Sequence, residues 1–158
     1  MSGEIAEIAR VRQYRSEDWS AVARVWAATG LGGPQRGDNQ GVVEGSLARG
    51  GTLLVIEGPD GSGIVGTCWL TDDGRRLHLH HMGVMPAWQR RGLGKQLLVE
   101  ALGIARKVGR QVKLEVASDN AVAIRLYRAA GFEPLSGYEV LINRSTGAKY
   151  VPRDGTER

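Results

Sequence analysis

The sequence contains a single cysteine, Cys68, among its 158 residues. One cysteine cannot form an intramolecular disulfide framework, and it cannot supply the sulfur ligands of a cysteine-based zinc site. Cys68 lies in a strand-like stretch, where a small apolar side chain is usually buried. We therefore expect Cys68 to be a core residue and not a catalytic thiol.

Long apolar runs are also missing. The longest, such as residues 51–56, fall far short of the roughly 20 residues that a membrane-spanning helix requires. The N-terminus carries Glu4 and Glu7, where a secretory signal peptide would be basic and then apolar. These absences predict a cytoplasmic protein without a membrane partner.

The charge of the chain favours an anionic partner without naming it. The formal net charge is +4, but the positive residues are spread along the chain and no aromatic side chains alternate with them, so we expect no nucleic-acid partner. With 42% hydrophobic residues, a chain of this length can bury one substantial core. We expect residues 1–158 to form a single domain with its core at about residues 9–152.

Strand-like and helix-like segments succeed each other along the chain. Alternation of apolar and polar residues indicates a strand, and apolar residues spaced three and four apart indicate a helix. By these rules strands are predicted at residues 9–15, 52–57, 64–71, 75–85 and 112–117, and helices at 17–29, 42–48, 92–107 and 120–130. A terminal hairpin is predicted at residues 138–143 and 149–151.

The strand predicted at residues 75–85 contains an irregularity. Its early and late apolar residues have opposite parity, so either the strand changes its buried face or one extra residue is inserted around His80-His81. The insertion, a β-bulge, is the smaller change, and we predict it. The apolar residues concerned are Leu77 and Leu79, then Met82 and Val84.

A glycine-rich segment, residues 89–94, opens the helix predicted after this strand. The first N–H groups of a helix lack partners and carry partial positive charge, so such a segment can bind phosphate through its backbone. Gly92 and Gly94 present no side chain to block the approach, and neighbouring basic residues add charge. The alternative is an ordinary helix start with a solvated basic face.

Two common phosphate-binding motifs do not fit this segment. A Walker loop ending at Gly94-Lys95 would need glycine in place of Gln89 and a hydroxyl residue in place of Gln96. A Rossmann loop would need a small residue in place of Leu97 and a parallel βαβ unit near the start of the fold.

The segment instead resembles the Gln/Arg-x-x-Gly-x-Gly/Ala signature of the GNAT family of N-acetyltransferases. Residues 120–132 resemble a later motif of that family, in which an Asn opens a helix and a Tyr follows seven residues later, ahead of Gly-Phe. The resemblance covers nearly the whole chain. It implies an α/β fold of the acyl-CoA N-acyltransferase (GNAT) type, with a mostly antiparallel mixed sheet that is splayed between strands four and five and flanked by about four helices.

The resemblance also implies how acetyl-CoA, the co-substrate, binds. Backbone N–H groups of the glycine-rich segment would hold the pyrophosphate, and the strand backbone from Met82 to Val84 would pair with the pantetheine arm. Asn120 and Tyr127 fall on one helix face, about 10 Å apart along the axis, so both could face that arm. The implied cofactor-binding residues are Met82, Gly83, Val84, Gln89, Arg90, Arg91, Gly92, Leu93, Gly94, Lys95, Asn120 and Tyr127.

The activity implied is transfer of an acetyl group from acetyl-CoA to a primary amine by direct attack in a ternary complex. Tyr127 would be the general acid that protonates the departing thiolate; the alternative is a tyrosine that only completes the core. Many family members use a Glu of the fourth strand as base, and this chain has no acidic residue at 75–85. His80 or His81 could serve, since the usual pKa of histidine is near 6.5, and Glu115 on the next strand is a further candidate.

The histidines at positions 78, 80 and 81 also permit a metal site, because alternation along a strand would put two of their rings on one face. Zinc would need at least a third ligand, and no cysteine or acidic residue lies nearby in the sequence. We predict no metal site.

A non-catalytic acyl-CoA-binding sensor or assembly module is the alternative function, because the strand-four acid is missing. The amine acceptor is not named by any motif; in this family it is set by the segments corresponding to residues 31–50 and to the terminal hairpin. Trp69, Trp88 and Asp38 are candidates to line its site. Family members are often dimers, which implies a homodimer here.

Overall fold

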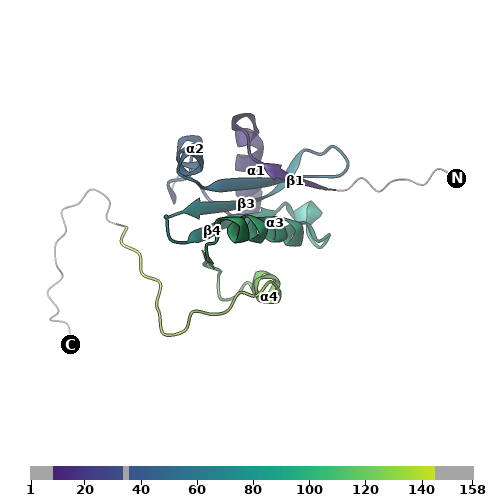
Figure 1. The fold of residues 1–158 in the computed structure, drawn as a ribbon. Coiled ribbons are helices and arrows are strands. Elements are labelled where there is room, and N and C mark those ends of the chain that lie inside the picture. Colours follow the sequence, from purple (N-terminus) through teal and green to yellow (C-terminus); the bar gives the residue numbers. More distant parts are fainter. Residues whose placement is uncertain (1–8, 34–35, 145–158) are drawn as a thin grey trace.

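The computed structural model describes residues 9–33 and 36–144, which contain one five-stranded sheet (Figure 1). The strands lie side by side in sequence order; β1 to β4 pair antiparallel, whereas β4 and β5 pair in parallel. The mixed, mostly antiparallel sheet expected from the sequence is therefore confirmed. The strands are β1 (Arg10–Gln13), β2 (Thr52–Glu57), β3 (Ile64–Asp72), β4 (Leu77–Val84) and β5 (Val112–Leu114).

Four α-helices accompany the sheet within the described residues. They are α1 (Trp19–Thr29), α2 (Gln40–Ala48), α3 (Leu93–Val108) and α4 (Ala121–Ala129). Short 3-10 helices, η1 (Ser16–Asp18) and η3 (Pro86–Trp88), precede α1 and α3. None of the described helices is both long and apolar enough to cross a bilayer.

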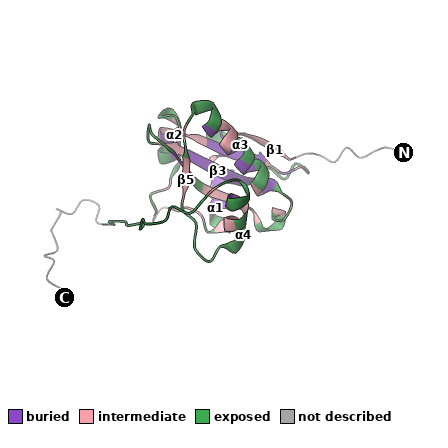
Figure 2. Ribbon diagram, turned by 60° about the horizontal axis from the view of Figure 1, so that its bottom comes forward, coloured by how far each residue is buried: buried purple, intermediate pink, exposed green. Residues whose placement is uncertain are grey.

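Each face of the sheet has its own apolar core, because α1 and α2 lie over one face and α3 over the other (Figure 1). The amphipathic pattern of α3 buries the predicted stripe, and Cys68 is fully buried beneath it, as expected. Trp69 is also core, on the α1 side. Figure 2 shows the buried centre of the sheet, with the exposed residues on the outer faces of the helices and in the segment after α4.

The β-bulge predicted around His80-His81 is confirmed. The register of the β3–β4 pair places two residues of β4, His81 and Met82, opposite the single residue Cys68 of β3. His81 adopts a left-handed backbone conformation, with φ of 46°. Because of the extra residue, the apolar side chains of β4 on both sides of the bulge pack into the core beneath α3. These side chains are Leu77, Leu79, Met82 and Val84.

The C-terminal part of the prediction is wrong where the structure describes it. Residues 138–143 form no strand, and 149–151 lie outside the described residues. β5 ends at Leu114 and not near residue 117, and Tyr138, Val140 and Ile142 are 68–76% exposed. β-forming side chains favour a strand only where a neighbouring strand completes the hydrogen-bond ladder, and the local pattern does not supply that neighbour.

Candidate active site

β4 and β5, the last two strands in the order of the sheet, pair along only part of the length of β4. Their parallel pairing ends at Leu79 and Leu114, while β4 continues to Val84. The edge of β4 at residues 80–84 that faces β5 thus has no strand partner within the described part of the chain, and its backbone groups are available for another extended molecule. This is the splay between strands four and five that the sequence predicts.

A cavity of about 420 Å³ lies at this splay and brings together predicted site residues from three elements. His80, His81 and Met82 come from β4, Glu115 follows β5, and Asn120 and Tyr127 come from the N-cap and the last turn of α4. Leu31 and Arg36, from the segment between α1 and α2, also line it. The cavity is therefore bounded by all the segments that carry candidate acid and base groups; we call it the splay cavity.

Tyr127 is held firmly by the end of its own helix. The N–H of Phe132 donates to the Tyr127 carbonyl at 3.0 Å, and Gly131 takes the left-handed conformation that this helix end requires. The two aromatic rings pack edge to face at 5.6 Å, so the helix end fixes the tyrosine ring. Gly131 and Phe132 thus close α4 behind the tyrosine.

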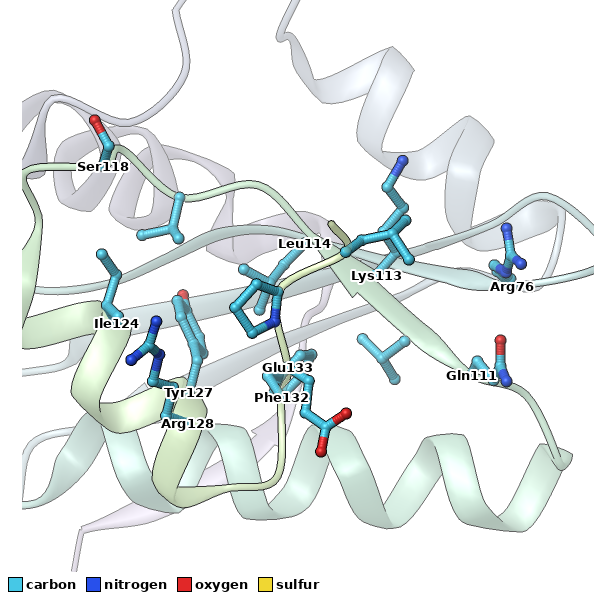
Figure 3. Close-up of a pocket in the computed structure, with 14 residues that line it drawn as sticks. Arg76, Gln111, Lys113, Leu114, Ser118, Ile124, Tyr127, Arg128, Phe132 and Glu133 are labelled. Carbon is cyan, nitrogen blue, oxygen red and sulfur yellow. The ribbon is translucent and has the colours of Figure 1, made fainter. Parts of the chain in front are cut away.

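The environment of the Tyr127 side chain favours its protonated form. The residue is 8% exposed, and burial raises the pKa of its phenol to about 12. Besides the splay cavity, Tyr127 lines a second cavity of about 430 Å³ between β5 and α4, shown in Figure 3 together with Leu114, Ile124 and Phe132. Tyr127 thus lies between the two cavities, which also share Lys113, Leu114 and Val116.

Asn120 caps α4 and still has donors to offer. Its Oδ1 accepts a hydrogen bond from the backbone N–H of Ala123 at 3.1 Å, so the helix opens at this residue as predicted. A side-chain amide also carries two N–H donors, and among the described residues none accepts from those of Asn120. The amide can therefore cap the helix and donate into the splay cavity at once.

The glycine-rich loop has the conformation of an anion-binding turn. Arg90 and Gly92 both adopt left-handed φ angles, 63° and 77°, and α3 starts at Leu93 with no side chain capping its first N–H groups. Alternating left-handed residues point successive N–H groups in one direction, which makes a concave site for phosphate. A Cβ placed on Gly92 would meet nothing within 4 Å, so the approach is open.

The side chains of the loop divide between structural and solvent-facing positions. Leu93 is buried in the α3 core, whereas Arg90 and Lys95 are exposed. Arg91 stacks over the Trp88 ring at 4.7 Å and donates to the Ala87 carbonyl. The guanidinium of Arg91 therefore faces η3, and the backbone is the part of the loop that is free for an anion.

Gln89 links the glycine-rich loop to β4, and Gly83 is the point at which β4 meets the segment after α1. The Gln89 side chain donates to the Val84 carbonyl at 2.9 Å, which ties the glycine-rich loop to the end of β4. A Cβ on Gly83 would lie 2.6 Å from Leu31 Cδ1, so Gly83 faces the segment after α1. Gly83 thus sets how closely that segment approaches β4.

The three base candidates differ in their partners. His80 is exposed, and its Nε2 lies 2.9 Å from Thr71 Oγ1. The pKa of its ring is lowered, first by partial desolvation and then by the charges of His81 and His78. Glu115 is exposed. His81 Nε2 lies 3.0 Å from Asp38 Oδ2, in a pair that sequence analysis missed because the two residues are 43 positions apart.

No group of three metal-ligating side chains is close enough to hold an ion in residues 9–33 and 36–144. The histidines of β4 instead pair one by one with Asp73, Thr71 and Asp38. The chemistry that these residues can supply is proton transfer.

Comparison with known proteins gives a family match over most of the chain. Residues 9–132 match the model of the acetyltransferase (GNAT) family. The N-alpha-acetyltransferase RimI of Mycobacterium tuberculosis is 43% identical over 77 residues, which are 46% of this chain and 48% of that protein. The mycothiol acetyltransferase of Clavibacter michiganensis subsp. michiganensis is 35% identical over 120 residues, 74% of this chain and 39% of that protein. The chain thus spans less than half the length of these curated relatives.

Solved structures share the fold. The predicted acetyltransferase of Clostridium acetobutylicum, solved with acetyl-CoA, has a TM-score of 0.69 at 13% identity and covers 85% of this chain and 96% of that chain. The PaiA N-acetyltransferase of Thermoplasma acidophilum, in complex with coenzyme A, has a TM-score of 0.67 at 19% identity, with 80% and 90% covered. At such identities the likeness establishes the fold.

Proposed function

Because this chain belongs to the acetyltransferase (GNAT) family, we propose that it transfers the acetyl group of acetyl-CoA to a primary amine by direct attack in a ternary complex. The observation that carries the proposal is the splay cavity. It joins the unpaired edge of β4 to a buried, protonated Tyr127, so that a thioester lying along β4 would have a proton donor beside its sulfur.

Acetyl-CoA would bind along two features of the fold. The backbone N–H groups of residues 90–95 hold the pyrophosphate at the start of α3, and the pantetheine arm pairs with β4 at residues 82–84. Asn120 donates its side-chain amide to the same arm from the opposite wall. Lys95 and Arg90 add positive charge near the phosphates without being needed for the shape of the loop.

The reaction needs two proton movements. A neutral amine attacks the thioester carbon, the carbonyl oxygen is polarised by a backbone N–H of β4, and the amine nitrogen loses a proton to a base at the cavity. The C–S bond then breaks, and Tyr127 donates a proton to the sulfur, so that the products are an amide and a free thiol.

The raised pKa of Tyr127 defines its part in this step. A free thiol is a stronger acid than a phenol with a pKa of about 12, so Tyr127 holds its proton until negative charge has built up on the sulfur. Tyr127 therefore acts first as a hydrogen-bond donor that stabilises charge on sulfur as the C–S bond breaks. Burial ensures that the donor is protonated at every physiological pH.

The test combines a binding measurement with a transfer assay. Calorimetry measures the Kd of acetyl-CoA, and release of the coenzyme A thiol is followed with a panel of amines that contains amino acids, amino sugars and peptides with free N-termini. We expect Tyr127→Phe to lower kcat by about 10²-fold or more with little change in the Kd of acetyl-CoA. Tyr138→Phe, at a 76% exposed position, is the matched control and should behave as wild type.

The outcomes separate the proposal from its alternatives. Turnover that Tyr127→Phe leaves unchanged would eliminate Tyr127 as the proton donor. Tight binding of acetyl-CoA with no transfer to any amine would favour the acyl-CoA sensor or assembly module. Absence of acetyl-CoA binding would contradict both functions.

A further inference from the structure

We propose that His81 is the base that accepts the proton of the acceptor amine and that Asp38 is the residue that positions it, an inference that rests on the proposed acetyl transfer. In the structure His81 belongs to the bulge of β4, and Asp38 belongs to the segment between α1 and α2. Both lie on the α1 side of the sheet, and His81 lines the splay cavity that Tyr127 enters from α4.

The hydrogen bonds define which ring nitrogen is available. His81 Nε2 lies 3.0 Å from Asp38 Oδ2, and a carboxylate can only accept, so Nε2 carries the hydrogen and Nδ1 keeps a lone pair. Nδ1 has no partner among the described residues, and no side-chain nitrogen or oxygen there is both fully buried and unpartnered. Nδ1 is therefore not fully buried, and His81 is one of the residues that line the splay cavity.

The ring is packed against two tryptophans of the α1 side. Trp26 packs edge to face against it at 4.4 Å, and Trp69 does the same at 5.4 Å. The Thr67 hydroxyl accepts from Trp26 Nε1 and donates to the His81 carbonyl, at 2.9 and 2.8 Å, so the left-handed backbone of the bulge is tied to the same cluster. A base that must meet one atom of a substrate benefits from such fixed orientation.

Asp38 is fixed as tightly as His81. Its Oδ2 also accepts from the Gly33 N–H at 3.1 Å, and the side chains of Asp38 and His81 are only 10% and 15% exposed. A Cβ on Gly32 would lie 2.9 Å from Asp38 Oδ2 and 3.1 Å from His81 Nε2, so only glycine lets the backbone cover the pair. The segment after α1 is thus built around this hydrogen bond.

A carboxylate behind the ring is the feature that distinguishes His81 from His80. When the imidazole takes a proton, an adjacent carboxylate stabilises the cation and holds the reacting nitrogen toward the substrate. His80 has a hydroxyl partner and an exposed ring, and Glu115 is exposed. The other ionisable or charged groups around the cavity are His78, His80, Arg36, Lys113, Glu115 and Tyr127.

The proton balance of the step is complete. As the C–N bond forms, the amine nitrogen gives one proton to His81 Nδ1; as the C–S bond breaks, the sulfur receives one from Tyr127. Both side chains return to their resting forms by exchange with water that enters the cavity. Base and acid approach the reacting carbon from β4 and α4, on either side of the splay.

The test compares single variants, and the double variant of His81 and Asp38, with the amine that wild type accepts best in the panel. His81→Asn keeps a residue type that tolerates the left-handed backbone, and we expect it to lower kcat/KM at neutral pH by about 10²-fold or more with the Kd of acetyl-CoA unchanged. Asp38→Asn should cost roughly 10- to 100-fold. Asp73→Asn is the control, because Asp73 makes a similar contact to a histidine, His78, but does not line the splay cavity.

Two readouts distinguish proton transfer from a structural effect. The deficit of His81→Asn should shrink as the pH rises, because hydroxide then accepts the proton that the missing base would have taken. The double variant should be no slower than His81→Asn alone, since Asp38 acts only through His81. A deficit that is constant with pH, additive losses in the double variant, or a larger loss in His80→Asn would each overturn the assignment.

A spectroscopic measurement covers the case of a variant that fails to fold. Nitrogen-15 NMR of wild type should show the Nε2-H tautomer in the neutral form of His81, and the opposite tautomer would overturn the proposal. If wild type binds acetyl-CoA but acetylates nothing, the proposed function fails, and with it the base. If wild type is active and His81→Asn equally so, only the base assignment fails.

Discussion

Replacing Gly32 by alanine should destabilise the protein and disturb the Asp38–His81 pair. Two effects contribute to the loss of stability, and they can be separated. Gly32 has a φ of 65°, and a side chain in that region costs about 1 kcal/mol or more. The added Cβ would also lie 2.9 Å from Asp38 Oδ2, 3.0 Å from Trp26 Cε3 and 3.1 Å from His81 Nε2, and overpacking of this kind costs about 1–3 kcal/mol. Together they should lower the free energy of unfolding by about 3 kcal/mol, or the melting temperature by about 6–12 °C.

Gly30→Ala measures the backbone effect alone, which is the cost of a side chain at a positive φ. Gly30 has a φ of 69°, close to that of Gly32, but a Cβ there would meet nothing within 4 Å. We expect Gly30→Ala to lower the melting temperature by only about 2–4 °C, with normal activity. Gly32→Ala should in addition lose turnover, as Asp38→Asn does, while binding acetyl-CoA normally. Equal melting temperatures for the two variants, or full activity of Gly32→Ala, would refute the idea that Gly32 makes room for the pair.

Two further predictions concern the ionisable groups of the core. Because burial raises the pKa of Tyr127 to about 12, the acid form persists as the pH rises, and kcat measured at saturating substrates should show no loss from this group between about pH 8 and 10; a fall centred near pH 10 that disappears in Tyr127→Phe would contradict this. Cys68 is fully buried with its pKa raised to about 12, so Ellman's reagent should leave it unmodified in the native protein and titrate one thiol in concentrated guanidinium chloride. Rapid labelling of the native protein would show that the α3 core opens around β3.

The sequence predicts the parts of the site that depend on periodicity. The parity break between Leu79 and Met82 is enough to locate the bulge, and the seven-residue spacing of Asn120 and Tyr127 is enough to bring both to one cavity. Helix caps are equally local, since the Gly131-Phe132 pair closes α4 by hydrogen bonds within six residues. In each case the determining interactions lie within one element or its immediate ends.

The parts that were missed depend on contacts between distant segments. The Asp38–His81 hydrogen bond joins an irregular segment to the middle of a strand, and no periodicity connects them. The length of β5, and whether residues 138–143 form a strand, depend on which backbone groups find hydrogen-bond partners. The type of side chain does not determine those partners. The predicted roles of the loop residues, Asn120 and Tyr127 remain predictions that ligand binding and kinetics must test.

The bulge in β4 links the two halves of the proposed reaction. In a regular strand residue 81 would face α3 with Leu77 and Leu79, and the apolar residues after it would face α1, so the imidazole would be buried on the wrong side of the sheet. One inserted residue instead turns His81 toward Trp26 and Asp38 while Met82 and Val84 stay in the α3 core. The same stretch of β4 lies beyond its last pairing with β5, so its free edge adjoins the base. A single irregularity can thus place the acetyl donor and the base at one point of the sheet, which explains why the strand departs from regular geometry at His81.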